Sequence, residues 1–302
     1  MLLAVSVDLD EVHHYRDIHR LASRGRGTEV YTRAIPRLAD WARQRRIPLT
    51  WFAVGQDLEQ AANADTLAQL ARDGDEIGCH SYSHFYDLTR RSAAMMRSEI
   101  ERGVAAIEGV ASTKVKGFRA PGYVVSDTLL DLLREAGLAY DSSVFPCPAY
   151  YALKTGAIAA QTARRQEPHS IVDVPEVLRA PTAPYRVGRP YWFRGTGIVE
   201  VPIQVTRRAR LPFIGTSLTM AGAFGARLLA RGVLGEPFVN LELHGLDALD
   251  ASDGLQDLAR NQRDLRIPWS KKLEALDAAV ELLRAHGYRC VRLDELAANA
   301  AG

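Results

Sequence analysis

The 302-residue sequence is poor in cysteine, and the few thiols that it has are scattered. Cys79, Cys147 and Cys290 lie far apart and form no CxxC pair, which excludes a disulfide framework and a zinc site built from thiolates. Thiols without such a pattern are typical of a reducing compartment. The net charge is only +2, which is too small to indicate a nucleic-acid partner, so we expect none.

The sequence also lacks a hydrophobic run long enough to cross a bilayer. Its longest uncharged stretch, residues 211–226, falls short of the roughly 20 apolar residues that a transmembrane helix needs. The first residues run directly into acidic ones, without the basic start and cleavage site of a secretory signal. We therefore expect a cytoplasmic protein without a transmembrane segment. Contact with the inner face of the membrane stays open, because residues 211–234 can form an amphipathic helix, but a helix packed on the protein is the preferred interpretation.

The sequence does contain a repeated alternation of short apolar runs with helical patterns, which is typical of α/β folds with a parallel sheet. Strands are predicted at residues 2–8, 48–54, 76–80, 115–119, 138–141, 238–244 and 288–293. Helices are predicted at residues 28–46, 65–72, 92–108, 126–136 and 270–286. The alternation fails at about residues 145–235, which hold most of the fourteen prolines and two short β-like runs, 171–174 and 198–205. We interpret residues 1–302 as one domain with a long late insertion at about 145–235.

Two carboxylates follow the first predicted strand. Because side chains alternate between the two faces of a strand, Asp8 and Asp10 share one face, whereas Glu11 should face away from Asp8. A paired carboxylate of this kind is suited to metal binding or to general base catalysis. Acidic residues that merely cap the next loop explain the pair about equally well when it is considered alone.

Two histidines follow the third predicted strand, in the segment HSYSH at residues 80–84. Histidines four residues apart lie on one side of a helical turn, so His80 and His84 are close enough to bind one metal ion. The spacing alone is weak evidence, because it also arises by chance. Two histidines and one carboxylate leave coordination positions open for water and substrate, which is typical of a catalytic metal site.

Two later strands also end in polar residues. Arg119 precedes a Pro-Gly turn that ends at Tyr123, where a guanidinium can hold a carboxylate and backbone N–H groups can point into a site. His244 ends the strand at 238–244, and Asn240 and Glu242 share its face. Each residue alone also fits a surface turn or a structural histidine. Four strand ends that each carry a suitable residue indicate an active site at the carboxyl edge of a barrel.

These motifs resemble, in order and across nearly the whole chain, those of the polysaccharide deacetylase family, also called the NodB-homology or carbohydrate esterase family 4 group. DLD at residues 8–10 is similar to a spaced form of the first motif, and HSYSH is similar to the second. RAPGY at 119–123, YDSS at 140–143 and LH at 243–244 resemble the third, fourth and fifth. The spaced first motif and YDSS resemble the branch that contains exopolysaccharide-locus deacetylases, lipid-linked arabinose deformylases and some amidohydrolases.

The resemblance implies a distorted (β/α)7-type barrel of the NodB-homology fold and a metal centre in it. Asp10, His80 and His84 would bind one divalent metal ion. The ion in such proteins is usually zinc, with cobalt, manganese or nickel as alternatives.

The resemblance also implies a division of catalytic roles. Asp8 would be the general base, Arg119 would hold Asp8, and His244 would be the general acid. Asp141 would tune this charged network. A backbone N–H near Tyr123 would stabilise the oxyanion.

The expected function is metal-dependent removal of an N-acyl group, such as acetyl, from an amino sugar or glycan-like substrate. Alternatives are deformylation or deacetylation of a lipid-linked amino sugar, hydrolysis of another C–N amide bond as in a ureide or formamide, and a non-catalytic carbohydrate-binding role, which the complete motif set disfavours. We expect Tyr123 and Trp192 to contact the substrate. Other aromatic residues of the insertion can either stack on a sugar ring or pack beneath the insertion: Tyr150, Tyr151, Tyr185, Tyr191 and Phe193.

Overall fold

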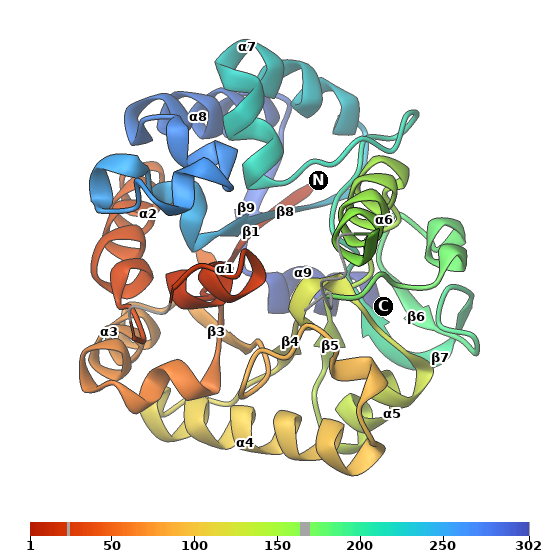
Figure 1. Ribbon diagram of the computed structural model, residues 1–302. Coiled ribbons are helices and arrows are strands. Elements are labelled where there is room, and N and C mark those ends of the chain that lie inside the picture. Colours follow the sequence, from red (N-terminus) through yellow and green to blue (C-terminus); the bar gives the residue numbers. More distant parts are fainter. Residues whose placement is uncertain (23–24, 164–169, 302) are drawn as a thin grey trace.

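The computed structural model describes residues 1–22, 25–163 and 170–301, and they form a curled, mostly parallel sheet surrounded by helices (Figure 1). The strands are β1 (Leu2–Asp8), β2 (Leu49–Ala53), β3 (Glu76–Cys79), β4 (Gly117–Phe118), β5 (Tyr140–Asp141), β6 (Tyr185–Val187), β7 (Arg194–Glu200), β8 (Phe238–His244) and β9 (Arg289–Val291). Their order is β6-β7-β5-β4-β3-β2-β1-β8, and β9 pairs with the beginning of β1. The predicted distorted α/β barrel is confirmed.

Helices surround the barrel and cover both of its ends. They are α1 (Val12–Ile18), α2 (Ile35–Arg45), α3 (Ala61–Arg72), α4 (Ala93–Ala111), α5 (Asp127–Glu135), α6 (Pro148–Ala163), α7 (Gly215–Val233), α8 (Trp269–Ala285) and α9 (Leu293–Ala301). In Figure 1, α1 and α6 lie in front of the strands, α9 lies behind them, and the others form an outer ring. The short helix α1 therefore crosses the same end of the barrel as the loops that follow the strands.

The barrel is not closed by strand pairing between β7 and β8. The chain that leaves β7 fills the gap instead: Ile203 donates its N–H to Val144 O at 2.9 Å, and Asn240 of β8 donates its side-chain N–H to Val201 O and Pro202 O at 3.4 and 3.2 Å. Further along, Ile214 forms a parallel bridge with Glu242. Residues 201–214 thus hold β8 in place beside the rest of the sheet.

Several element boundaries differ from the sequence predictions. The helix predicted at 28–46 is divided into a π-helical turn (Val30–Ala34) and α2, because Pro36 has no N–H to continue the regular hydrogen-bond ladder. The run at 171–174 is not a strand, and the strand predicted at 198–205 ends earlier, at Glu200, and begins at Arg194. The helix predicted at 92–108 corresponds to α4, and Ser92 is its N-cap, with Oγ 3.2 Å from the Met95 N–H.

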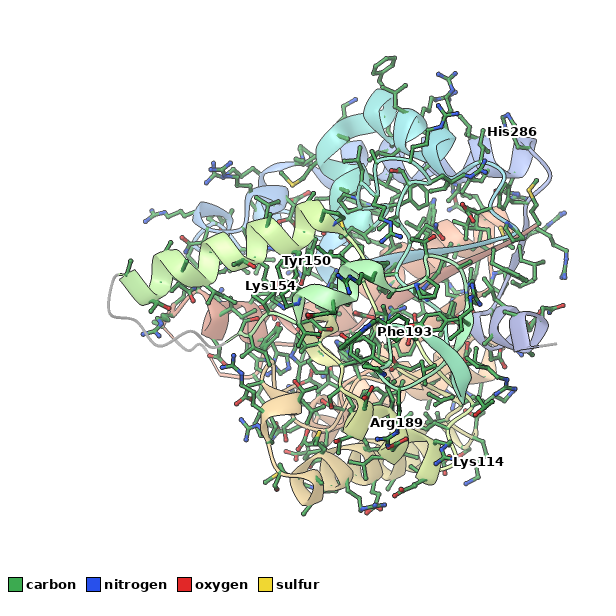
Figure 2. The ribbon with its side chains drawn as sticks, turned by 90° about the vertical axis from the view of Figure 1, so that its right-hand side faces the viewer. Lys114, Tyr150, Lys154, Arg189, Phe193 and His286 are labelled. Carbon is green, nitrogen blue, oxygen red and sulfur yellow. The ribbon has the colours of Figure 1, made fainter. Side chains whose placement is uncertain are left out.

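Residues 145–235, which were predicted as an insertion, contain α6, β6, β7 and α7; residues 164–169 lie outside the described residues. Helix α6 is absent from our predictions. It has no buried residue along its length, so its sequence needs no apolar face, which is the pattern that would have predicted a helix. Figure 2 shows α6 from the side, running out from the body of the molecule. Within the part of the chain that the structure describes, no helix is long and apolar enough to traverse a bilayer.

Candidate active site

A cavity of about 440 Å³ opens at the carboxyl ends of the barrel strands. The predicted residues that line it are Asp8, Asp10, His80, His84, Tyr123 and His244. Helices α1, α6 and α7 provide outer walls that are largely apolar and aromatic: Tyr15, Ile18, Tyr150, Leu153 and Met220. The fold therefore brings side chains that are far apart in the sequence to one site, as the predicted strand ends required.

Asp10, His80 and His84 present ligand atoms to one point. These atoms all lie within 4.8 Å of one another, His80 Nε2 and His84 Nε2 are 3.1 Å apart, and Asp10 Oδ1 lies 4.0 Å from His80 Nε2. Ligand atoms on one tetrahedral zinc are about 3.4 Å apart, given bonds of about 2.0–2.2 Å. Asp10 Oδ1 is buried and accepts no hydrogen bond from the described residues. The three side chains therefore fit a divalent cation.

The backbone around the histidines is not a helical turn, in contrast to our prediction. Ser81 and His84 have left-handed backbone conformations, with φ of 62° and 55°, and the Ser83 N–H and Oγ donate to Glu99 at 2.7 and 2.9 Å. These bonds wind residues 80–84 into an irregular loop. His80 Nδ1 lies 2.7 Å from Arg119 O, and a protonated Nδ1 donating to this carbonyl leaves Nε2 free to bind a metal.

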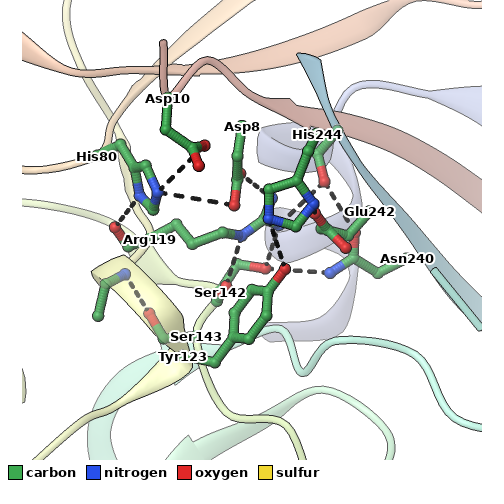
Figure 3. A network of polar contacts seen from close by, with 12 residues as sticks. Asp8, Asp10, His80, Arg119, Tyr123, Ser142, Ser143, Asn240, Glu242 and His244 are labelled. Atoms are coloured by element: carbon green, nitrogen blue, oxygen red, sulfur yellow. Dashed lines mark hydrogen bonds and ion pairs between the residues drawn. The ribbon is translucent and has the colours of Figure 1, made fainter. Parts of the chain in front are cut away.

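Arg119 is fully buried beneath Asp8 (Figure 3). Its Nη1 donates to Asp8 Oδ1 at 2.6 Å, and its Nη2 donates to the hydroxyls of Ser6 and Ser142, both at 2.9 Å. Its Nε donates to Ser142 O at 2.8 Å. A buried guanidinium with all of these partners is rigidly oriented, so Arg119 fixes the position of the Asp8 carboxylate.

His244 lies on the side of Asp8 that is opposite His80, and it contacts two polar side chains (Figure 3). Its Nδ1 lies 2.9 Å from Glu242 Oε1, and its Nε2 lies 3.2 Å from the Tyr123 hydroxyl. Burial lowers the pKa of His244, but the carboxylates of Glu242, Asp10 and Asp8, with Glu242 foremost, together raise this pKa well above its ordinary value. His244 is therefore held in its protonated form.

The two neighbouring carboxylates of the first motif differ in their protonation chemistry. Burial raises the pKa of Asp8, and this effect exceeds the opposing influence of Arg119. Burial also acts on Asp10, but His244, His84 and His80 together hold its pKa well below the usual range. Glu11 faces away from both, as alternation predicted, and accepts N–H bonds from Val12, Val30 and Tyr31 at 3.1–3.2 Å.

Besides Arg119, two further predicted site residues, Asp141 and Trp192, do not line the cavity. Asp141 accepts a hydrogen bond from Ser143 Oγ at 2.8 Å. Burial, together with the neighbouring Asp141 carboxyl, raises the pKa of Glu200 well above its usual range. The two buried carboxyls can therefore share a proton behind the site. Trp192 lies between β6 and β7, next to Tyr191 and away from the cavity lining. Trp192 therefore does not line this cavity.

The Tyr123 N–H, near which we expected an oxyanion donor, donates to Ala120 O at 3.1 Å. The Tyr123 side chain does line the cavity. Tyr123 directly follows Gly122 and has a left-handed backbone conformation, with φ of 58°. This backbone turn directs the phenol towards His244.

Sequence reasoning did not assign roles to two important groups. Strand alternation placed Glu242 on the same face as His244, and from this placement the sequence could have predicted that the two side chains are in contact. Tyr15 reaches the cavity from α1, which we did not predict because its seven residues are too few to establish a periodic pattern.

Comparison with known proteins bears on the family. Residues 27–140 match the model of the polysaccharide deacetylase family. A curated relative, the bifunctional xylanase/deacetylase of Pseudobutyrivibrio xylanivorans, is 31% identical over 90 residues, which are 30% of this chain and only 15% of that protein. The chain is therefore similar to the polysaccharide deacetylase family over part of its length.

Solved structures share the fold of this chain. A protein from Mycobacterium smegmatis, assigned as a polysaccharide deacetylase, superposes with a TM-score of 0.63 at 18% identity, over 99% of this chain and 90% of its own. A carbohydrate esterase family 4 pseudoenzyme from Bacillus anthracis gives a TM-score of 0.52 at 13% identity, over 98% of this chain and 65% of its own. At these identities the likeness concerns the fold.

Proposed function

We propose that this chain is a metal-dependent hydrolase that removes an N-acyl group, acetyl above all, from an amino sugar or glycan-like substrate. One observation carries the proposal: Asp10, His80 and His84 converge at a cavity in which Asp8 and His244 flank the same point. The similarity of residues 27–140 to the polysaccharide deacetylase family agrees with this chemistry. A complete set of acidic, basic and metal-binding side chains also argues against a purely carbohydrate-binding role.

A divalent ion such as zinc, held by Asp10, His80 and His84, would lower the pKa of a water molecule and polarise the scissile carbonyl. Asp8 is oriented to take a proton from the attacking water, because Arg119 fixes one of its oxygens and Asp8 Oδ2 lies 3.8 Å from His80 Nε2. Its raised pKa makes it a better proton acceptor than an ordinary carboxylate.

His244 is suited to protonate the leaving amine. Glu242 keeps the imidazole charged and binds its Nδ1, which leaves Nε2 to deliver a proton into the cavity. The Tyr123 hydroxyl lies 3.2 Å from this Nε2, so the proton would leave His244 beside the Tyr123 side chain. Arg119 and Glu242 thus act as positioning residues behind the base and the acid.

The cavity also favours a second candidate, deacylation of a lipid-linked amino sugar. Leu153 of α6 and Met220 of α7 line the cavity although they are 75% and 53% exposed, and Phe224, which follows the kink at Gly222 of α7, is 77% exposed. An apolar rim of this kind can contact an acyl or prenyl chain, whereas a soluble oligosaccharide would leave it in water.

The direct test is to measure acetate and formate release by the purified protein, before and after chelation, from three substrates: a soluble N-acetylglucosamine oligomer, a lipid-linked N-acetyl amino sugar and a lipid-linked formamido sugar. We expect release that is abolished by chelation and restored by zinc or cobalt. Preference for a lipid-linked substrate would select the second candidate. Glycan binding without acyl release under any metal would contradict both.

A further inference from the structure

A second group of metal-ligand side chains lies beside the cavity. His13 and His14 come from α1, and Asp57 comes from the 3-10 turn Gly55–Glu59 that follows β2. The ligand atoms of the three residues all lie within 4.8 Å of one another. We propose that His13, His14 and Asp57 bind a second divalent transition-metal ion, of which zinc is the best match to two imidazoles and one carboxylate.

The distances distinguish a metal site from a hydrogen-bonded ion pair. His13 Nε2 lies 3.7 Å from Asp57 Oδ1, and His14 Nε2 lies 3.5 Å from Asp57 Oδ2. Both distances exceed the usual 2.7–3.2 Å of an N–H···O hydrogen bond, and neither Asp57 oxygen accepts one from the described residues. They match the separation of about 3.4 Å between two ligand atoms on one tetrahedral zinc ion. The two imidazoles face different oxygens of one carboxylate, an arrangement that an ion between them explains.

Asp57 itself needs a cationic partner. Its side chain is 1% exposed, and neither carboxylate oxygen accepts a hydrogen bond from any residue that the structure describes. The backbone of Asp57 is fully engaged, since its N–H donates to Val54 O and its carbonyl accepts from Asn63 Nδ2. A buried carboxylate without donors is costly, and a bound cation removes that cost.

The position of this site suggests what the ion does. The His14 ring lies 4.5 Å from the His84 ring, so the second site adjoins the first, and His13 is 17% exposed and leaves an access route for the ion. Helix α1 also carries Tyr15 and Ile18 into the cavity wall. An ion on these three ligands would clamp α1 to the turn after β2 and so fix that wall.

The experiment counts metal ions in the purified full chain by mass spectrometry after zinc loading and exhaustive dialysis. We expect two equivalents in the wild type, one in the His80→Ala/His84→Ala variant, and one in either Asp57→Asn or His13→Ala. His13→Ala is included because His13 is partly exposed and its loss burdens folding less than that of Asp57. His286→Ala, at the surface end of α8 (Figure 2), controls for adventitious histidine binding and should keep two.

A cobalt-loaded His80→Ala/His84→Ala protein isolates the second site spectroscopically. We expect visible d–d absorption that disappears when Asp57→Asn is added. A wild type whose single equivalent is lost in the His80→Ala/His84→Ala protein, or a residual ion in that protein that survives both Asp57→Asn and His13→Ala, would overturn the proposal. A loss confined to the Asp57 and His13 variants would support the second site while contradicting the first.

Discussion

Glu242 and His244 lie two residues apart on β8, and their side chains meet with Glu242 Oε1 2.9 Å from His244 Nδ1. Residues at this spacing share one face of a strand, so the strand itself provides the acid with its charged partner. Figure 3 shows this pair across Asp8 from His80. Asp8 therefore lies between the predicted metal ligand His80 and the Glu242–His244 pair.

The Glu242→Gln variant should shift the alkaline limb of the pH–rate profile to lower pH. Glu242 raises the pKa of His244, so the imidazolium that donates the proton persists to higher pH in the wild type. Without the carboxylate this pKa falls, and His244 loses its proton earlier as pH rises. At pH 8 we expect kcat/KM to fall by up to about 100-fold, within the range of general acid catalysis. The measurement is kcat/KM from pH 5 to 9, with metal content as the control; an unmoved alkaline limb would exclude His244 as the acid.

Asp8→Asn and Asp10→Asn should separate the base from the metal ligand. Asp8→Asn should retain the metal and lose on the order of 10²–10⁴-fold in turnover, because it removes the proton acceptor. Asp10→Asn should weaken metal binding, because its carboxylate is held ionised beside His80 and His84. Metal titration and turnover are measured on both variants. If Asp8→Asn releases the metal and Asp10→Asn does not, the two assignments are reversed.

The strand ends show how much of the site the sequence could predict. Once alternating faces place Asp8 with Asp10, and Glu242 with His244, a parallel barrel brings them to one edge regardless of its details. The predicted bounds of β1 and β8 agree with the structure, because both are continuous buried runs between polar boundaries.

The remaining features depend on contacts that have no local signature. Helix α1 is held by its long-range neighbours: Glu11 caps its first turn at Val12 and also accepts N–H bonds from Val30 and Tyr31. Whether an aromatic residue of the insertion reaches the cavity depends on the path of the chain. Tyr150 and Trp192 are equally suited to stacking, yet the fold brings Tyr150 to the lining.

The Arg119–Asp8 pair should be strongly coupled in stability. Arg119→Met should lower the free energy of unfolding by about 3–5 kcal/mol, because it leaves the buried Asp8 carboxylate without its charged partner. The Asp8→Asn/Arg119→Met double variant should lose less than the sum of the single changes, because no buried charge of the pair remains. Urea unfolding of metal-free proteins measures the cycle, and additive losses would show that the pair is not coupled.

Tyr150→Ala should change substrate choice without affecting the metal. The Tyr150 ring lines the cavity and packs against Tyr123 and Phe145, with ring centroids 5.6 and 4.8 Å away, so it can stack on a sugar unit next to the reacting amide. Contacts of this kind help to position the bond that is cleaved. We expect kcat/KM for an extended glycan or a lipid-linked sugar to fall at least about 10-fold, as expected for the loss of roughly 1.4 kcal/mol of binding in the transition state, and kcat/KM for a small activated acetyl ester to change little.

Trp192→Ala is the matched control for this experiment, because Trp192 is an aromatic residue of the same region that lies away from the cavity. It should leave the ratio of the two kcat/KM values unchanged, and any loss should affect both substrates equally through stability. A larger loss on the glycan for Trp192→Ala than for Tyr150→Ala would place the substrate along β6 and β7 instead. Equal losses on both substrates for Tyr150→Ala would show that Tyr150 supports the wall of the cavity and not the sugar.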